Sequence, residues 1–187
     1  MSKKQFPGAT SLFPVPAVMV SCGADDFAPN IITIAWVGTV NSAPPMVSVS
    51  IRASRHSHGM VTASKEFVVN LPSAEQVEAL DYCGVMSGAT VDKFAGMNLT
   101  PVMGTLKYAP LIKECPVNLE CQVVQEIDLG SHTMFIGEIK QVHVSEEFLN
   151  EQGRVDHKKL RPIAYCGPNY YTLGEVIGQH GMTNVKR

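Results

Sequence analysis

The chain has 187 residues, of which 45% are hydrophobic and 17% are charged, and its formal net charge is −2. This length suits one domain with a sizeable core, which we expect to cover residues 1–187. A nearly neutral chain gives no electrostatic case for a nucleic-acid partner. No apolar run approaches the roughly 20 residues of a membrane span, so no membrane partner is expected.

The cysteines favour a reducing environment. Their number is odd and none form a C-x-x-C pair, and the lysine-containing start of the chain lacks the apolar segment of a signal peptide. We therefore expect a cytoplasmic protein with free thiols. Cys166, in "YCGPNYY", is the thiol most suggestive of a reactive role, although a buried structural cysteine explains it as well. The cysteines are Cys22, Cys83, Cys115, Cys121 and Cys166.

Short apolar segments in the first third of the chain predict strands. Val15 to Gly23 forms the first, and residues 31–40, "IITIAWVGTV", predict a long strand covered on both faces. Met46 to Arg52 alternates apolar residues with serine, which is typical of a half-buried strand. Residues 54–66 predict a short helix, and residues 67–72, "FVVNLP", a further strand.

A helix is predicted from the segment "SAEQVEALDYCGVMSG". Ser73 followed three residues later by Gln76 matches a capping box. Val77, Leu80 and Val85 are the expected apolar stripe of this helix.

The second half of the chain is predicted to be mostly β. Residues 117–123 alternate apolar and polar side chains, and His132 to Val144 has apolar residues on both faces. Many strands and few helices predict a mainly β fold, a β-barrel with helical insertions. The two-faced apolar strand and the low charge favour a homodimer.

Polar side chains gather in "SVSIRASRHSHGM", Ser48 to Met60, where a strand ends. Arg52, Arg55 and Ser57 offer charged and hydroxyl donors, and a following helix adds oriented N–H groups, so the segment suits a phosphate. A solvated turn with ordinary surface ion pairs explains the same composition equally well.

Other site types lack support in the sequence. His56 and His58 have no Cys, Asp or Glu beside them to complete a metal site. No G-x-S-x-G, G-x-G-x-x-G or P-loop is present, so neither a serine nucleophile nor a Rossmann nucleotide site is indicated.

Five segments in order carry a resemblance: "NIITIAW", "PPMVSVSIRASRHSHGMV", "EFVVNLP", "DYCGVMSGATVDKFAGMNL" and "GSHTMFIGEI". Together, from about Val15 to Gly174, the chain resembles the flavin reductase-like FMN-binding proteins, and within them the flavoredoxin group. The resemblance implies a split β-barrel with a Greek-key arrangement. It also implies a homodimer that holds FMN non-covalently near the subunit interface.

The resemblance assigns three groups of residues to the cofactor. The strand along the isoalloxazine ring, whose backbone amides would bond the polar edge of the ring, is represented by Thr33, Ile34, Ala35 and Trp36. The end of a second strand beside the flavin is represented by Ser50, Ile51 and Arg52. The surroundings of the phosphate and ribityl chain are represented by Arg55, His56, Ser57 and His58, with Lys93 as the second cation and Phe94 beside it.

Structural roles compete with several of these assignments. Trp36 would also suit the core, Lys93 would also suit a solvated helix face, and His132 is read as a structural or interface residue outside the catalytic set. Flavin carries its own redox chemistry, so no catalytic acid or base is named.

Several functions are compatible with the resemblance. One is a reductase that takes hydride from NADH or NADPH, and another is an electron carrier reduced by a protein donor, towards which the flavoredoxin pattern leans. A flavin-binding or storage protein without turnover is the alternative, and a barrel that binds no flavin is a further one.

Overall fold

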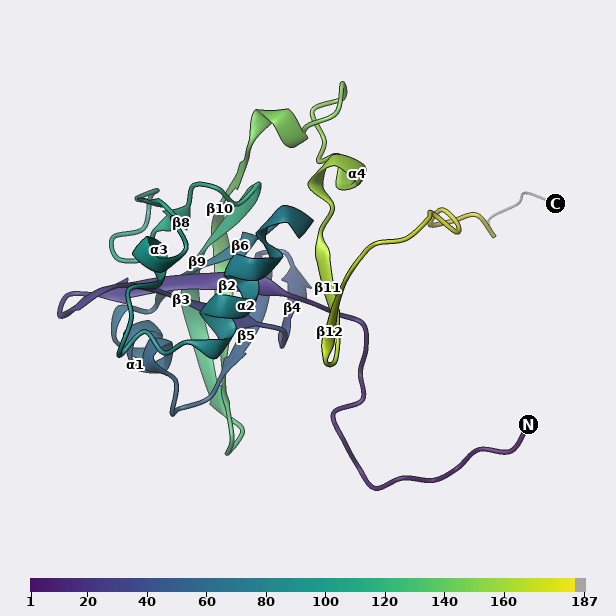
Figure 1. Ribbon diagram of the computed structural model, residues 1–187, viewed down its shortest axis with the longest axis horizontal. Helices are drawn as coiled ribbons and strands as arrows, with labels where there is room; N and C mark the ends of the chain where they lie inside the picture. Colours follow the sequence, from purple (N-terminus) through teal and green to yellow (C-terminus); the bar gives the residue numbers. More distant parts are fainter. Residues whose placement is uncertain (184–187) are drawn as a thin grey trace.

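Seven strands form one antiparallel sheet in the computed structural model, which describes residues 1–183 (Figure 1). Their order across the sheet is β3-β2-β6-β9-β10-β5-β4. The predicted mainly β class with helical insertions is confirmed. The strands are β2 (Val18–Ala24), β3 (Phe27–Ile34), β4 (Val37–Ser42), β5 (Pro45–Ile51), β6 (Glu66–Leu71), β9 (Val117–Asp128) and β10 (Thr133–Val144).

The sheet folds back on itself because its two edge strands are consecutive in the chain. β3 and β4 are joined through Ala35 and Trp36, and the Ser50 amide donates to the Trp36 carbonyl at 3.0 Å. The prediction of one strand over residues 31–40 is therefore wrong: the chain passes from one edge of the sheet to the other at this point. β4 is not covered on both faces either, since Val40 is 49% exposed.

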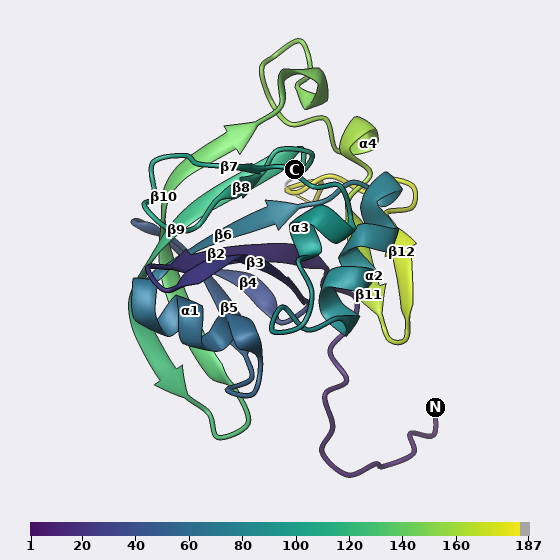
Figure 2. The same cartoon turned by 60° about the vertical axis from the view of Figure 1, so that its left-hand side comes forward.

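Three helical segments pack against the edge strand β3 and its neighbour β2 (Figure 2). The predicted helix in residues 54–66 is confirmed as α1, which adds Met60 and Val61 to the barrel core beside Phe67 and Phe135. The helical segments are α1 (His56–Ser64), η1 (Ala74–Gln76), α2 (Val77–Val85), α3 (Lys93–Gly96), η2 (Glu146–Phe148) and α4 (His157–Leu160). No helix in residues 1–183 has the length and apolar character to cross a bilayer.

The capping box before α2 is confirmed, but its predicted apolar stripe is wrong. Val77 and Val85 lie on the exposed side, and Val85 is 70% exposed. The buried row is Ala79, Leu80 and Cys83, which is also spaced at helical intervals. This row packs in a second core between α2, α3 and the outer side of β2 and β3.

The chain ends add a small sheet beside the barrel. The predicted strand Val15–Gly23 is interrupted at Ala17, whose amide donates to the Ile163 carbonyl at 3.2 Å. The part before the break pairs with the C-terminal hairpin, in the order β1-β11-β12. The remaining strands are β1 (Val15–Pro16), β7 (Pro101–Val102), β8 (Leu111–Ile112), β11 (Ile163–Cys166) and β12 (Asn169–Thr172).

Gly137 in β10 provides a test of how tightly the barrel core is packed. A Cβ added at this position would lie 2.5 Å from Cζ of Phe67 and 2.9 Å from Cβ of Cys121. We expect Gly137→Ala to lower the free energy of unfolding by about 1–3 kcal/mol, the usual cost of overpacking. Urea denaturation measures it. The control is Gly59→Ala in α1, where a Cβ meets nothing within 4 Å, and which should be neutral or stabilising; equal effects would contradict the packing argument.

Candidate functional site

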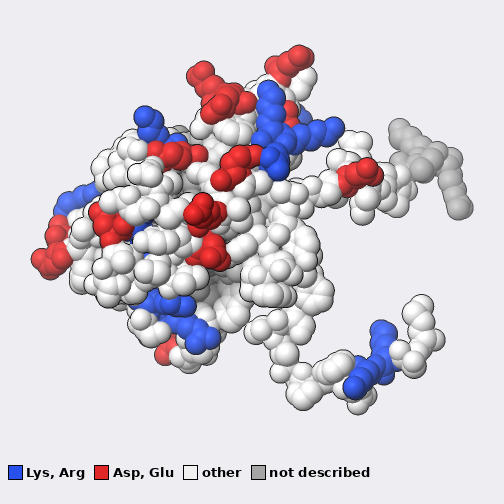
Figure 3. All heavy atoms as spheres, viewed as in Figure 1, with Lys and Arg blue, Asp and Glu red and all other residues white. Residues whose placement is uncertain are grey.

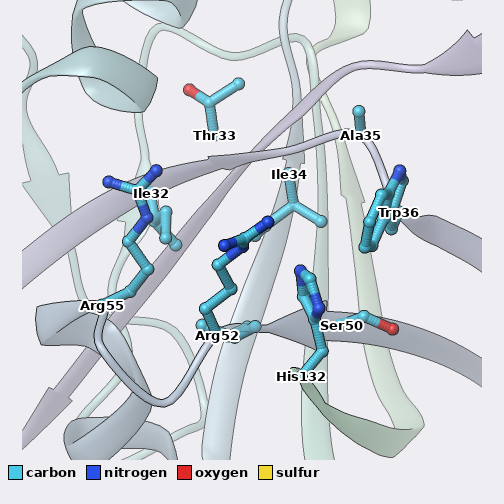
Figure 4. Close-up of a pocket in the computed structure, with 10 residues that line it drawn as sticks. Ile32, Thr33, Ile34, Ala35, Trp36, Ser50, Arg52, Arg55 and His132 are labelled. Carbon is cyan, nitrogen blue, oxygen red and sulfur yellow. The ribbon is translucent and has the colours of Figure 1, made fainter. Parts of the chain in front are cut away.

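A first cavity of about 160 Å³ opens where β3 ends, beside the end of β5 (Figure 4). Side chains from the β5–α1 loop and from the turn before β10 complete its walls. Its lining is Ile32, Thr33, Ile34, Ala35, Trp36, Ser50, Ile51, Arg52, Arg55 and His132. The structure therefore brings together the predicted residues of the two strands and adds Ile32 and His132.

The free edge of β3 borders this cavity. β3 pairs only with β2, and the carbonyl of Ile31 accepts a hydrogen bond from Lys93 instead of from a strand. The main-chain N–H and C=O of one residue point to the same side of a strand, and the side alternates along the chain. Thr33 and Ala35 therefore also present main-chain groups away from β2, as the prediction of backbone hydrogen bonding requires.

Two exposed arginines approach the first cavity from the loop that precedes α1. Figure 4 shows the guanidinium groups of Arg52 and Arg55 beside the end of β3. The loop is held by the Arg55 amide, which donates to the Arg52 carbonyl at 3.0 Å. Within residues 1–183 neither side chain forms an ion pair, so both remain free to bind an anion.

Trp36 and His132 form an aromatic wall of the first cavity. Their ring centroids are 4.4 Å apart, and Trp36 is 45% exposed, so the core reading of Trp36 is wrong. Partial burial and the neighbouring Arg52 hold the pKa of His132 below its ordinary value. His132 lies at the site because Thr133 pairs with Ile51, which places the preceding residue beside Arg52. That register is a long-range feature, and the segment "GSHTMF" alone did not reveal it.

A second cavity continues from the first, with which it shares Ile32 and Arg55. Here the loop between α2 and α3 comes close to β3: a Cβ on Gly88 would lie 2.1 Å from Oδ1 of Asn30. The predicted phosphate residues Arg55, His56, Ser57 and Lys93 all line this cavity. Its full lining is Asn30, Ile32, Ser54, Arg55, His56, Ser57, Cys83, Gly84, Met86, Ser87, Gly88 and Lys93.

Lys93 is a buried cation at the inner wall of the second cavity. It is 4% exposed, which excludes the solvated reading, and its Nζ donates to the carbonyls of Ile31 and Cys83, both at 2.7 Å. Burial lowers the pKa of Lys93, and the charge of Arg55 lowers it further, against smaller opposing effects of nearby thiols. No carboxylate pairs with it in the described part of the chain. Since an ammonium has three donors, one is left for a ligand.

Two predicted residues lie outside both cavities. His58 has its Nε2 2.9 Å from Oγ1 of Thr133 and its ring edge-on to Phe135, so it braces α1 against β10. Phe94 is 6% exposed and packs in the second core. Ser57, which does reach the second cavity, accepts a hydrogen bond from the Asn30 amide at 2.8 Å. Among the described residues no three His, Cys, Asp or Glu side chains gather at a metal-like distance.

Residues 10–174 match the family model described as flavin reductase like domain, and the chain belongs to this flavin-binding family. Within it the fold is that of the flavoredoxins. The flavoredoxin of Desulfovibrio vulgaris (Miyazaki F) superposes with a TM-score of 0.90 at 34% identity, covering 98% of this chain and 100% of that one. The flavoredoxin of Methanosarcina acetivorans gives 0.88 at 32% identity over 97% and 100%.

A curated relative with a stated activity is the NADH-dependent FAD reductase of Streptomyces globisporus. It is 29% identical over 128 residues, which are 68% of each chain. The predicted split-barrel fold and the predicted resemblance to flavoredoxins are thus confirmed.

Proposed function

We propose that the protein binds FMN and transfers electrons through it, with the isoalloxazine ring in the first cavity and the phosphate in the second. The observation that carries this proposal is the buried, unpaired ammonium of Lys93 facing the same cavity as Arg55. A buried cation without a carboxylate partner is costly unless an anion completes it. A phosphate is such an anion, and it would bring the acceptor that the third N–H of Lys93 lacks.

The donor set fits this cofactor. Arg55 and Lys93 would hold the phosphate, while Gly88 lets the loop close over it without a Cβ. The main-chain groups of Thr33 and Ala35 would meet the polar edge of the ring, with the side chain of Arg52 nearby. Trp36 and His132 would limit access of water from one side.

A bound FMN would itself supply the hydride and single-electron chemistry. The protein's part would be to orient the ring, to place the positive charge of Arg52 near it, and to leave one approach open. No residue of the chain needs to take or give a proton for this role.

We propose a homodimer, as expected from the sequence. β10 keeps Met134 and Ile136 only half-buried, and both terminal segments leave the barrel on one side as extended arms (Figure 1). These arms expose Phe13, at 64%, and Ile177, at 99%. Charged side chains gather instead over the upper part of the molecule near α4 (Figure 3). A second copy would cover this apolar surface.

Sedimentation velocity tests the assembly. We expect a dimer at micromolar concentration, and deletion of residues 1–13 should shift the equilibrium towards monomer. A wild-type monomer at that concentration would contradict the proposal.

The thiols are proposed to stay out of the electron path. Burial raises the pKa of Cys22 and Cys121 to about 12 and that of Cys83 to about 11, so thiolate is scarce at neutral pH. All five cysteines are free. This chemistry suits the reducing cytoplasm, in which we place the protein.

The electron donor separates two versions of the function. The flavoredoxin relatives favour an electron carrier reduced by a protein, and the FAD reductase relative favours direct use of NADH or NADPH. An anaerobic absorbance titration of the FMN-loaded protein with each nucleotide decides between them. Bleaching within seconds means a reductase, whereas a flavin reduced only by dithionite means a carrier that needs a protein donor.

Two controls address the remaining alternatives. A protein that takes up FMN but exchanges electrons with no donor or acceptor protein would be a storage protein. Failure to bind FMN after its addition would overturn the assignment of both cavities.

A further inference from the structure

A third cavity of about 380 Å³ continues the groove beyond the second, with which it shares Asn30, His56 and Gly88. It shares no lining residue with the first cavity. The three cavities therefore lie in a row, and the second is in the middle.

β3 and its extension run along this row like a floor. Residues 33–36 line the first cavity, Asn30 and Ile32 line the second, and residues 28–30 line the third. Eight residue steps of an extended strand span about 26 Å. This length exceeds what a mononucleotide needs and matches the scale of an extended dinucleotide.

The walls of the third cavity differ from those of the second. Among its lining residues no Lys or Arg occurs, so it has no cation for a further phosphate. His56 contributes an aromatic face and stands edge-on to Phe27, with ring centroids 5.8 Å apart. Proline and phenylalanine side chains make apolar walls, whereas Thr90 and Asp92 provide polar groups. An aromatic face with a few polar partners is suited to a purine and its ribose.

We propose that the third cavity receives the adenosine end of FAD, so that the same site accepts the dinucleotide flavin as well as FMN. This inference rests on the proposed function, because it takes the phosphate to lie in the second cavity. The pyrophosphate of FAD would then bridge from Lys93 and Arg55 to the neighbourhood of Gly88. The adenine would lie against His56, with Asp92 placed to accept from a ribose hydroxyl.

The test fills the third cavity and leaves the other two unchanged. Ala28 and Thr90 are exposed lining residues of the third cavity alone. Apoprotein of the wild type, Ala28→Trp and Thr90→Trp is titrated with FMN and with FAD by flavin fluorescence. We expect wild-type affinities for the two flavins within about tenfold of each other, and a loss of FAD affinity of tenfold or more in each variant with FMN affinity unchanged.

FMN binding reports that each variant is folded, and Thr39→Trp on the exposed side of β4 is the matched control. Wild-type FAD binding more than tenfold weaker than FMN binding overturns the inference and leaves the proposed function standing. FAD binding that neither tryptophan affects also overturns it, because the adenosine then lies elsewhere. If the wild type binds neither flavin, the proposed function falls together with this inference.

Discussion

Replacement of the buried lysine, Lys93→Met, is expected to weaken FMN binding by roughly 10- to 100-fold. A hydrogen bond to a charged group contributes about 1.5–3 kcal/mol, and each 1.4 kcal/mol changes the affinity about tenfold. Methionine keeps the length and apolar stem of the side chain but removes the charge and all three donors. Equilibrium titration of apoprotein with FMN measures the effect.

The control for this variant is Lys65→Met. Lys65 is half-exposed and pairs with Glu126 outside the three cavities, so FMN affinity should not change. Arg55→Ala should also weaken binding, by less than Lys93→Met, because Arg55 is solvent-exposed and its charge is screened. Unchanged FMN affinity in both Lys93→Met and Arg55→Ala would remove the phosphate from the second cavity.

A second large effect is expected at the buried carboxylate Glu120 in β9. Glu120 is fully buried and accepts from the amides of Thr105, at 2.7 Å, and Leu106, at 2.8 Å, as well as from His143. The loop comes so near that a Cβ on Gly104 would lie 2.4 Å from Oε1 of Glu120. One carboxylate therefore fastens the segment between β7 and β8 to the barrel.

Glu120→Gln should lower the free energy of unfolding by about 3 kcal/mol or more. The amide group of glutamine would turn a donor towards donors, which leaves buried N–H groups unpaired. Urea denaturation at neutral pH measures this. Glu126→Gln, which breaks a partly exposed pair with Lys65, should cost less than about 1 kcal/mol. Similar costs for the two variants would contradict the fastening role of Glu120.

The same carboxylate gives the wild type an acid-sensitive contribution to stability. Burial raises the pKa of Glu120, but the bonds from His143, Leu106 and Thr105 outweigh burial and hold the pKa below its ordinary value of 4.5. A depressed native pKa stabilises the fold above the unfolded value, and this stability is lost as the pH falls through the native pKa. Wild-type unfolding should therefore depend more steeply on pH below 4.5 than that of Glu120→Gln.

Local patterns in the sequence predicted those parts of the fold that local forces decide. The alternation over Met46–Arg52 and the capping box at Ser73 both describe neighbours in the chain, and both match the structure. The run over residues 31–40 misled because its apolar composition continues across the break at Ala35 and Trp36. That break depends on closure of the barrel, which is a long-range event.

The site followed the same division. The cluster that includes Arg55 and Ser57 could be recognised as a phosphate-binding segment because its donors are adjacent in sequence. The burial of Lys93 and the position of His132 depend on segments more than 60 residues away, respectively β3 and β5. The third cavity is likewise formed between β3 and the loop after α2, which no local pattern connects.

The free edge of β3 has a consequence for how the site tolerates change. At Thr33 and Ala35 the groups offered to the groove belong to the polypeptide backbone, so replacement of the side chain leaves them in place. Alanine scanning would therefore detect the cationic half of the site and overlook the half made by the strand. Sequence drift in this strand is constrained by packing against β2 and α2, while the pattern of amides and carbonyls that meets the ligand is inherited with the fold itself.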